Sequence, residues 1–140
     1  MGGDIDGEAR DDFSGSSVSL SSDGTRLAIG TPANDGNGIS SGNVRVYEYT
    51  SGTWVQMGSD IDGDAEGDYS GQSVSLSDDG FILAIGANYN DGNGIDAGQV
   101  KIYQYEVSDW VQMGVDIDGE AAGDGSGHSV FLSDDGFRVA

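Results

Sequence analysis

The chain has 140 residues, with 25 glycines, one proline and no cysteine, and its formal net charge is −20. The length suits one ordinary domain, and the lack of cysteine excludes disulfides and thiol catalysis. Such an acidic surface repels nucleic acid phosphates and anionic lipid heads, and no apolar run reaches the ~18 residues of a membrane span. We therefore expect no nucleic acid partner and no membrane insertion.

An acidic segment recurs three times along the chain. Asp-Ile-Asp-Gly followed by Glu or Asp begins at residues 4, 60 and 116, so the period is 56 residues. Self-similarity at a fixed period of this length indicates a repeat architecture. The sequence therefore predicts repeat 1 at residues 1–56, repeat 2 at residues 57–112 and a partial repeat 3 at residues 113–140.

Each complete repeat carries four strand-like runs. In repeat 1 the first run alternates polar and apolar residues, as a half-buried strand does, and Asp-Gly after it is a favoured hairpin turn. The runs of repeat 1 are residues 17–21, 26–30, 43–49 and 54–57. Those of repeat 2 are residues 73–77, 81–86, 99–105 and 110–113. Repeat 3 keeps the first run and most of the second, and no stretch shows helical periodicity, so the predicted fold is all-β.

Four short antiparallel strands per repeat are typical of a β-propeller blade. One such sheet is too thin to bury both of its faces, so neighbouring blades must stack. We therefore expect the pairs Trp54/Trp110 and Tyr47/Tyr103 to pack between blades. A β-solenoid is the alternative, but its rungs are usually shorter and lack hairpins at Asp-Gly.

The two ends of the chain match interior positions of the repeat. Met1 stands where Met57 and Met113 open repeats 2 and 3, and residues 137–140 match only the start of a second strand. We expect a fragment of a larger propeller, about two and a half blades long. Unpaired strand edges attract further strands, so the expected partners are further blades of the same protein or a second copy of the chain.

The motifs that flank the strands resemble those of the FG-GAP repeat family of β-propeller blades. That family has Phe-Gly before the first strand, Gly-Ala-Pro after the second and an aromatic third strand. Here residues 13–15 and 69–71, Phe-Ser-Gly and Tyr-Ser-Gly, stand at the first position. Residues 29–32 and 85–88, Ile-Gly-Thr-Pro and Ile-Gly-Ala-Asn, stand at the second, and residues 44–49 match the third strand.

The resemblance implies a non-catalytic scaffold or recognition module, in an extracellular or cell-surface protein, whose ligand is a protein or a carbohydrate. Met1 is followed directly by Gly2-Gly3-Asp4, so we expect no signal peptide in this chain, and we expect it to be part of a longer protein. Repeat 3 departs from the pattern, because Gly125 stands where the aromatic residue of the first motif would be.

The acidic loop is the candidate metal site. Asp60, Asp62, Asp64 and Asp68 fall at positions 1, 3, 5 and 9 of the loop, a spacing that can converge oxygens on Ca²⁺. The glycine expected at position 6 is replaced by Ala65. The alternative is a strand edge whose acids face water and guard against aggregation. A calcium-stabilised adhesive repeat is therefore the alternative function, and no other cofactor is expected.

A second polar loop, Asn-Asp-Gly-Asn-Gly, occurs at residues 34–38 and 90–94. Its oxygens could bind a cation or a sugar. The composition is also that of a plain turn, since Asn, Asp and Gly tolerate the left-handed backbone conformation.

A catalytic propeller, such as a glycosidase or a lyase, is the third interpretation. Glycoside hydrolysis uses a pair of carboxylates, but here the acids recur in every repeat, whereas a catalytic pair breaks the symmetry. His128 is the only histidine, and its counterparts are Ser16 and Gln72. The sequence therefore predicts no catalytic residues.

Overall fold

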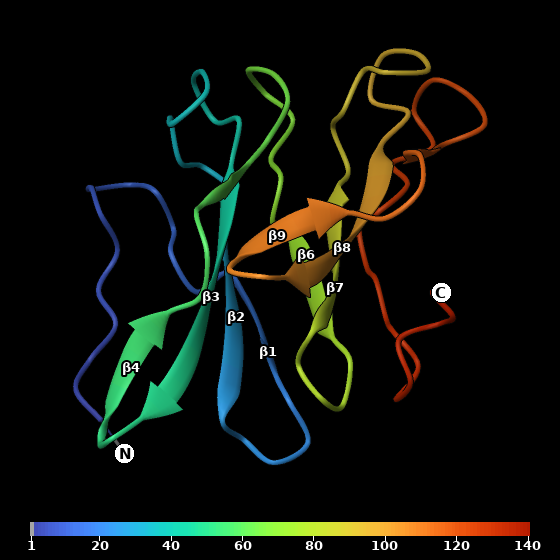
Figure 1. Cartoon of the computed structure of the whole chain (residues 1–140). Coiled ribbons are helices and arrows are strands. Elements are labelled where there is room, and N and C mark those ends of the chain that lie inside the picture. The colour runs from blue at the N-terminus through green and yellow to red at the C-terminus, as the bar shows by residue number, and fades with distance from the viewer. Residues whose placement is uncertain (1) are drawn as a thin grey trace.

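The computed structural model describes residues 2–140, and in that range it contains two antiparallel β-sheets and no helix (Figure 1). The first sheet, blade 1, contains β1 (Ser17–Leu20), β2 (Arg26–Thr31), β3 (Asn43–Thr50), β4 (Thr53–Gln56) and β5 (Ile61–Asp62). The second sheet, blade 2, contains β6 (Ser73–Leu76), β7 (Ile82–Ala87), β8 (Gln99–Glu106), β9 (Asp109–Gln112) and β10 (Ile117–Asp118). The predicted all-β class is confirmed. The interpretation of Met1 lies outside the described residues.

The four long strands of each blade follow the predicted order, β1-β2-β3-β4 and its counterpart one repeat later. The Asp-Ile-Asp segments form the short strands β5 and β10, which pair with β3 and β8, as the strand-edge alternative for the acidic loop predicts. They form because Asp-Ile-Asp alternates polar and apolar residues. This alternation lets Ile61, which is 8% exposed, enter the core opposite Val44.

Repeat 3 folds back as a hairpin without continuous strands. Leu132 and Val139 form an isolated bridge, and the backbones of Phe131 and Ala140 exchange two hydrogen bonds. The predicted strands are incomplete because no third strand lies beside this hairpin among residues 2–140, and an isolated pair of strands is marginally stable.

The blades stack face to face and share their hydrophobic core. One face of blade 2 packs against blade 1 through a cluster that contains Val74, Leu76, Leu83 and Ile85 on one side and Ala28, Val44 and Val46 on the other. The opposite face of blade 2 packs against the repeat 3 hairpin through Ile82, Ala84, Val100, Val130 and Leu132. Each thin sheet therefore buries its faces only by stacking on its neighbours.

Glycines let the backbones of successive blades touch. A Cβ atom on Gly30 would overlap the carbonyl oxygen of Gly71 in the next blade, and Gly86 stands in the same relation to Gly127. Beside this contact the Ser17 hydroxyl donates to the Gly71 carbonyl oxygen (2.7 Å), as Ser73 does to Gly127 (2.8 Å). The same close contact is thus built twice, one repeat apart.

Trp110 packs against the hydrophobic core between the two blades. It is 8% exposed, and its indole nitrogen donates to the carbonyl oxygen of Met57 at 2.9 Å. Tyr103 and Tyr105 are partly buried against the same cluster. Trp54, the counterpart of Trp110, is only half-buried, so among residues 2–140 the expected inter-blade role is met by Trp110 and not by Trp54.

Candidate functional site

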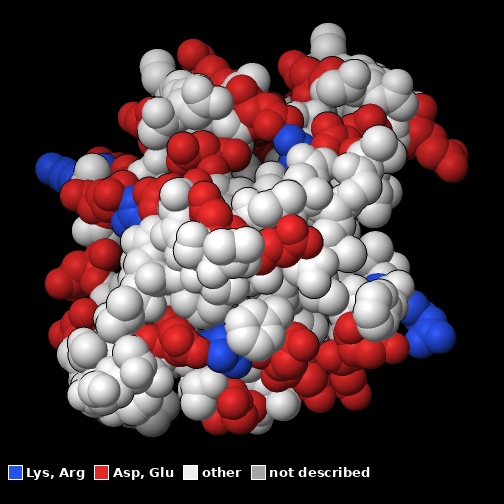
Figure 2. Space-filling model, viewed as in Figure 1, with Lys and Arg blue, Asp and Glu red and all other residues white. Residues whose placement is uncertain are grey.

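The acidic loops of residues 60–68 and 116–124 lie at one edge of the stacked blades, at the top of the view in Figure 1, whereas the N-terminal acidic segment runs along the left side of blade 1. They share this edge with the loops that join β2 to β3 and β7 to β8. Red side chains cover these loops in Figure 2. Crowded carboxylates repel one another unless a positive charge, a hydrogen-bond donor or a metal compensates them. The partners of the four candidate aspartates therefore decide what this edge can do.

Asp60 is held within blade 1. Its carboxylate accepts a hydrogen bond from Arg45 at 2.6 Å and one from Gln56 at 2.7 Å. The Arg45 guanidinium lowers the pKa of Asp60, although partial burial opposes the shift. Arg45 also pairs with Glu8 of the preceding acidic loop. One cation on β3 thus joins two successive acidic loops.

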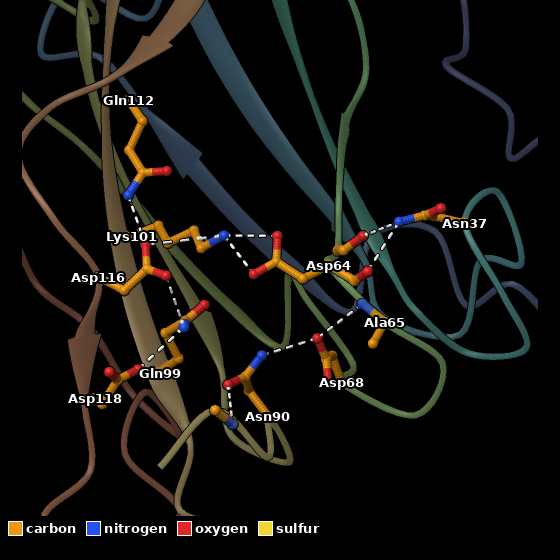
Figure 3. A network of polar contacts seen from close by, with 12 residues as sticks. Asn37, Asp64, Ala65, Asp68, Asn90, Gln99, Lys101, Gln112, Asp116 and Asp118 are labelled. Atoms are coloured by element: carbon orange, nitrogen blue, oxygen red, sulfur yellow. Dashed lines mark hydrogen bonds and ion pairs between the residues drawn. The ribbon is translucent and has the colours of Figure 1, made fainter.

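Asp64 crosses to the next blade (Figure 3). Its two carboxylate oxygens accept hydrogen bonds from the Lys101 ammonium group at 2.6 and 2.5 Å. Lys101 also lies 3.9 Å from Asp116 in the following acidic loop. Lys101 on β8 therefore repeats the arrangement of Arg45 on β3, with a cation between the fifth position of one loop and the first position of the next.

Asp68 is buried, at 4% exposure. Its carboxylate accepts hydrogen bonds from the Asn90 side chain at 2.9 Å and from the Ala65 backbone at 3.0 Å (Figure 3). Burial raises the pKa of Asp68, and the hydrogen bond from Asn90 only partly offsets that shift. Asp12 and Asn34 form the same pair one repeat earlier, at 3.0 Å. This pair ties each acidic loop to the neighbouring polar loop.

Asp62 differs from its counterpart in blade 2. There Asp118 accepts a hydrogen bond from the Gln99 side chain at 3.0 Å. In blade 1 the buried residue Asn43 stands in place of Gln99, and it donates to Asp60 instead of Asp62.

The pKa of Asp62 is raised, mainly because surrounding protein displaces water from the carboxylate and secondly because Asp60 is near. Asp62, Asp64 and Asp68 line one small cavity together with Lys101. The cavity measures about 10 Å³, the space of about one water molecule.

The structure thus gathers Asp62, Asp64 and Asp68 around one cavity and holds Asp60 apart beside Arg45. Within residues 2–140, no group of three or more carboxylate or imidazole side chains has the geometry to hold a metal ion. The calcium site stays a prediction.

The Asn-Asp-Gly-Asn-Gly loops use their side chains for their own folding. Asn34 accepts a hydrogen bond from the Gly36 backbone, and Asp35 accepts one from Ser40. The Asn37 side chain donates to the carbonyl oxygens of Gly63 and Asp64 (2.8 and 3.0 Å). The second copy repeats the first three of these contacts, so both loops are turns that brace the acidic loops.

Sequence reasoning missed the two cations that organise this edge. Arg45 and Lys101 occupy the same position of the third strand in both repeats, which was the available signal. His128 lies exposed on repeat 3.

Twisted antiparallel sheets that stack face to face, with their long loops at one edge, are blades of a β-propeller. The FG-GAP repeat family matches residues 4–47 and 54–103, which is more than half of the chain. The chain therefore belongs to the FG-GAP repeat family, and the resemblance seen in the sequence is confirmed. A search of curated proteins finds no match.

Membership of the family indicates the general role of the chain. FG-GAP repeats form propeller modules of the adhesion type, which are typically non-catalytic and extracellular. Its two named motifs hold the glycines that touch between blades, Gly71 after the aromatic residue and Gly30 near the end of β2. Across residues 2–140, no helix is long and apolar enough to cross a membrane.

Proposed function

We propose that this chain is a non-catalytic scaffold and recognition module of a secreted or cell-surface protein. One observation carries the proposal: the repeated charged groups hold blades and loops together in the same way in both repeats. Arg45 pairs with Glu8 and Asp60, and Lys101 pairs with Asp64 and lies 3.9 Å from Asp116. Groups engaged in this way position the loops and are not free for acid-base chemistry.

The charge of the surface narrows the class of ligand. A net charge of −20 repels polyanions at long range, so nucleic acid and anionic membranes do not fit. A protein or a carbohydrate is compatible with this charge. The loop edge is the expected binding surface, because the loops of a propeller can vary without disturbing its sheets.

We also propose that further blades, or a second copy of the chain, cover the open face of blade 1. Val18 and Leu20 are 60% and 57% exposed there, whereas their counterparts Val74 and Leu76, covered by blade 1, are 8% and 7% exposed. Contiguous exposed apolar surface of this kind marks an interaction site. Because blade 1 covers the counterparts Val74 and Leu76, a further blade is the partner that would cover Val18 and Leu20 in the same way.

Antibodies raised against this chain test the localisation. They should label intact, unpermeabilised cells of the source organism or detect the protein in the culture medium. Brief protease treatment of intact cells should remove the cell-bound signal. Labelling that requires permeabilisation and survives the protease would refute an extracellular role.

A calcium-stabilised adhesive repeat is the second candidate. The observation in its favour is that Asp62, Asp64 and Asp68 line one cavity, where burial already raises the pKa of Asp62 and Asp68. Asp64 already pairs with Lys101, but a cation would relieve the cost of holding Asp62 and Asp68 charged, and Ca²⁺ prefers such oxygens.

Thermal melts in EDTA and in millimolar Ca²⁺ test this candidate. A cation that binds only the folded chain stabilises it by RT ln(1 + [L]/Kd), about 2.7 kcal/mol at 100 times Kd. Asp62→Asn should abolish the shift, whereas Glu66→Gln, an exposed change in the same loop, should leave it intact. Identical melts with and without Ca²⁺ would eliminate the calcium candidate.

A further inference from the structure

A groove opens between blade 1 and blade 2 at the loop edge, beside the acidic loops. Its volume is about 490 Å³, within the range of small-molecule sites. Phe13 of repeat 1 and Tyr69 of repeat 2 line it, and Pro32, Ala33 and Ile39 contribute the other apolar surface. Asp12 and Asp35, which hold the neighbouring loops together, lie at the margin of the groove, whereas its apolar residues take no part in that network.

Successive repeats differ at several positions along this edge, and one difference bears directly on the groove. Tyr89 stands where repeat 1 has Ala33. In repeat 2 the Tyr89 ring packs against Tyr69, with ring centroids 5.3 Å apart. Ala33 has no ring to place against Phe13, which leaves the space beside it open. Loss of the symmetry at a surface position, with the sheets unchanged, is the pattern expected of a binding site grafted onto a scaffold.

The backbone conformation at Phe13 and Tyr69 is unfavourable for aromatic residues. Phe13 and Tyr69 have φ angles of 57° and 54°, a left-handed conformation that bulky residues rarely adopt. Gly125 takes the same position in repeat 3 with φ 63° and without that cost. The Phe13 side chain is also 65% exposed, so burial does not compensate the strain. The conformation itself recurs in every repeat and belongs to the framework, whereas the exposure of the Phe13 ring is what leaves it available to a ligand.

The polar lining supplies both donors and acceptors. Gln72 contributes an amide, and Ser16 and Ser40 contribute hydroxyl groups. The Ser16 hydroxyl donates to the Phe13 carbonyl oxygen at 2.8 Å, which leaves its oxygen able to accept. Arg10 and Asp11 lie at the same groove, paired at 3.4 Å and both exposed.

These charges restrict the ligand. The lining holds three carboxylates, Asp11, Asp12 and Asp35, beside the one guanidinium of Arg10, so it disfavours an anion. Each carboxylate already has a partner, Arg10 for Asp11, Asn34 for Asp12 and the Ser40 backbone for Asp35, so none of them needs a bound cation. A neutral ligand remains, one that offers an apolar face to an aromatic ring and many hydroxyls to amide, hydroxyl and carboxylate groups. A sugar ring has both properties.

We propose that this groove binds a neutral saccharide, with an apolar face of a sugar ring against Phe13 and its hydroxyls hydrogen-bonded to Gln72, Ser16 and Ser40. The proposal rests on the recognition role proposed above and names its ligand class.

The first test is an NMR titration of the full chain, labelled with ¹⁵N, at millimolar saccharide. The probes are N-acetylglucosamine, methyl α-mannoside, methyl β-galactoside and cellotriose, with sialyllactose as the anionic comparison and tri-arginine as the cationic one. At least one neutral probe should shift the backbone amide signals of Phe13, Tyr69 and Gln72, and the charged comparisons should bind more weakly. Absence of these shifts with all four neutral probes, or tighter binding of tri-arginine, would overturn the proposal.

Two variants separate binding from folding. Ala33→Tyr places in repeat 1 the ring that repeat 2 carries at Tyr89, and it should weaken binding at least tenfold. Ala121→Tyr makes the same change at an exposed position of repeat 3 and should leave binding unchanged. Undiminished binding by Ala33→Tyr would put the saccharide elsewhere.

Phe13→Gly copies repeat 3 and relieves the backbone strain, so it should weaken binding at least tenfold without lowering the melting temperature. A lower melting temperature with unchanged affinity would assign Phe13 a purely structural role and overturn the proposal. A failed titration beside positive labelling of intact cells overturns the saccharide alone. Labelling only after permeabilisation overturns the recognition role itself.

Discussion

Replacement of Trp110 measures how much of the fold's stability comes from the contact between blades. The ring is 8% exposed within the inter-blade cluster, and its indole nitrogen donates to Met57 at 2.9 Å. Trp110→Ala removes a buried ring and should lower the free energy of unfolding by about 3–5 kcal/mol. Trp110→Phe keeps an apolar ring but leaves the Met57 carbonyl oxygen without its donor. We therefore expect a loss of about 1–3 kcal/mol.

Trp54 provides the matched control, because it makes the same local contact without the covering blade. Its ring lies 5.2 Å from that of Tyr49, and Trp110 lies 5.3 Å from Tyr105. Since Trp54 is only half-buried, Trp54→Ala should cost roughly half as much as Trp110→Ala.

Urea unfolding of the three variants and the wild type, followed by far-UV circular dichroism, gives the free energies if the slopes agree. Equal losses for Trp54→Ala and Trp110→Ala would show that the local tyrosine contact, and not the blade interface, accounts for the stability. That result would refute the reasoning.

Three further changes test the contacts between blades. Gly86→Ala should lower stability by at least about 1–3 kcal/mol in urea unfolding, because its Cβ would overlap backbone of the repeat 3 segment; Gly3→Ala, which meets nothing within 4 Å, should be neutral. Asp68→Asn should become more stable relative to the wild type as the pH rises above about 3.8, because the folded carboxyl, whose pKa is raised from that value, holds its proton longer than the unfolded one. A free-energy difference that does not change with pH would contradict the burial of Asp68. Lys101→Met should cost about 1 kcal/mol at low salt and less at high salt, because the ion pair with half-exposed Asp64 is screened; a loss independent of salt would point to packing instead.

The strands were predictable because their signals are local. Alternation in residues 17–21 and Asp-Gly after them specify one hairpin, and the pairing of Ser17 with Gly30 and of Leu20 with Leu27 follows from it. The 56-residue period then repeats the assignment in blade 2. The strand β5 could be predicted only as one of two alternatives, because two residues carry too short a pattern and its partner β3 decides its conformation.

The acidic loop shows where local reasoning ends. Spacing within the loop suggested that Asp60 and Asp64 share one centre, but each finds a cation on the third strand of a different blade. Lys101 is 37 residues from Asp64, and only the stacking of the sheets brings the two side chains together. Spacing within a loop gives the order of its carboxylates, but sheet packing determines what compensates them.

Comparison of the two repeats therefore distinguishes residues that maintain the fold from residues that are candidates for binding. A feature that both blades share, such as the cation on the third strand or the glycine contact between sheets, serves the stacking that every blade requires. A feature that only one blade has is not needed for stacking. Ala33 against Tyr89 is such a difference, and it opens a groove beside an aromatic residue held in a strained conformation. Because the same fold tolerates both residues, exchange of one for the other changes the surface without changing the framework, which makes this position the most informative one for assigning a ligand to the molecule.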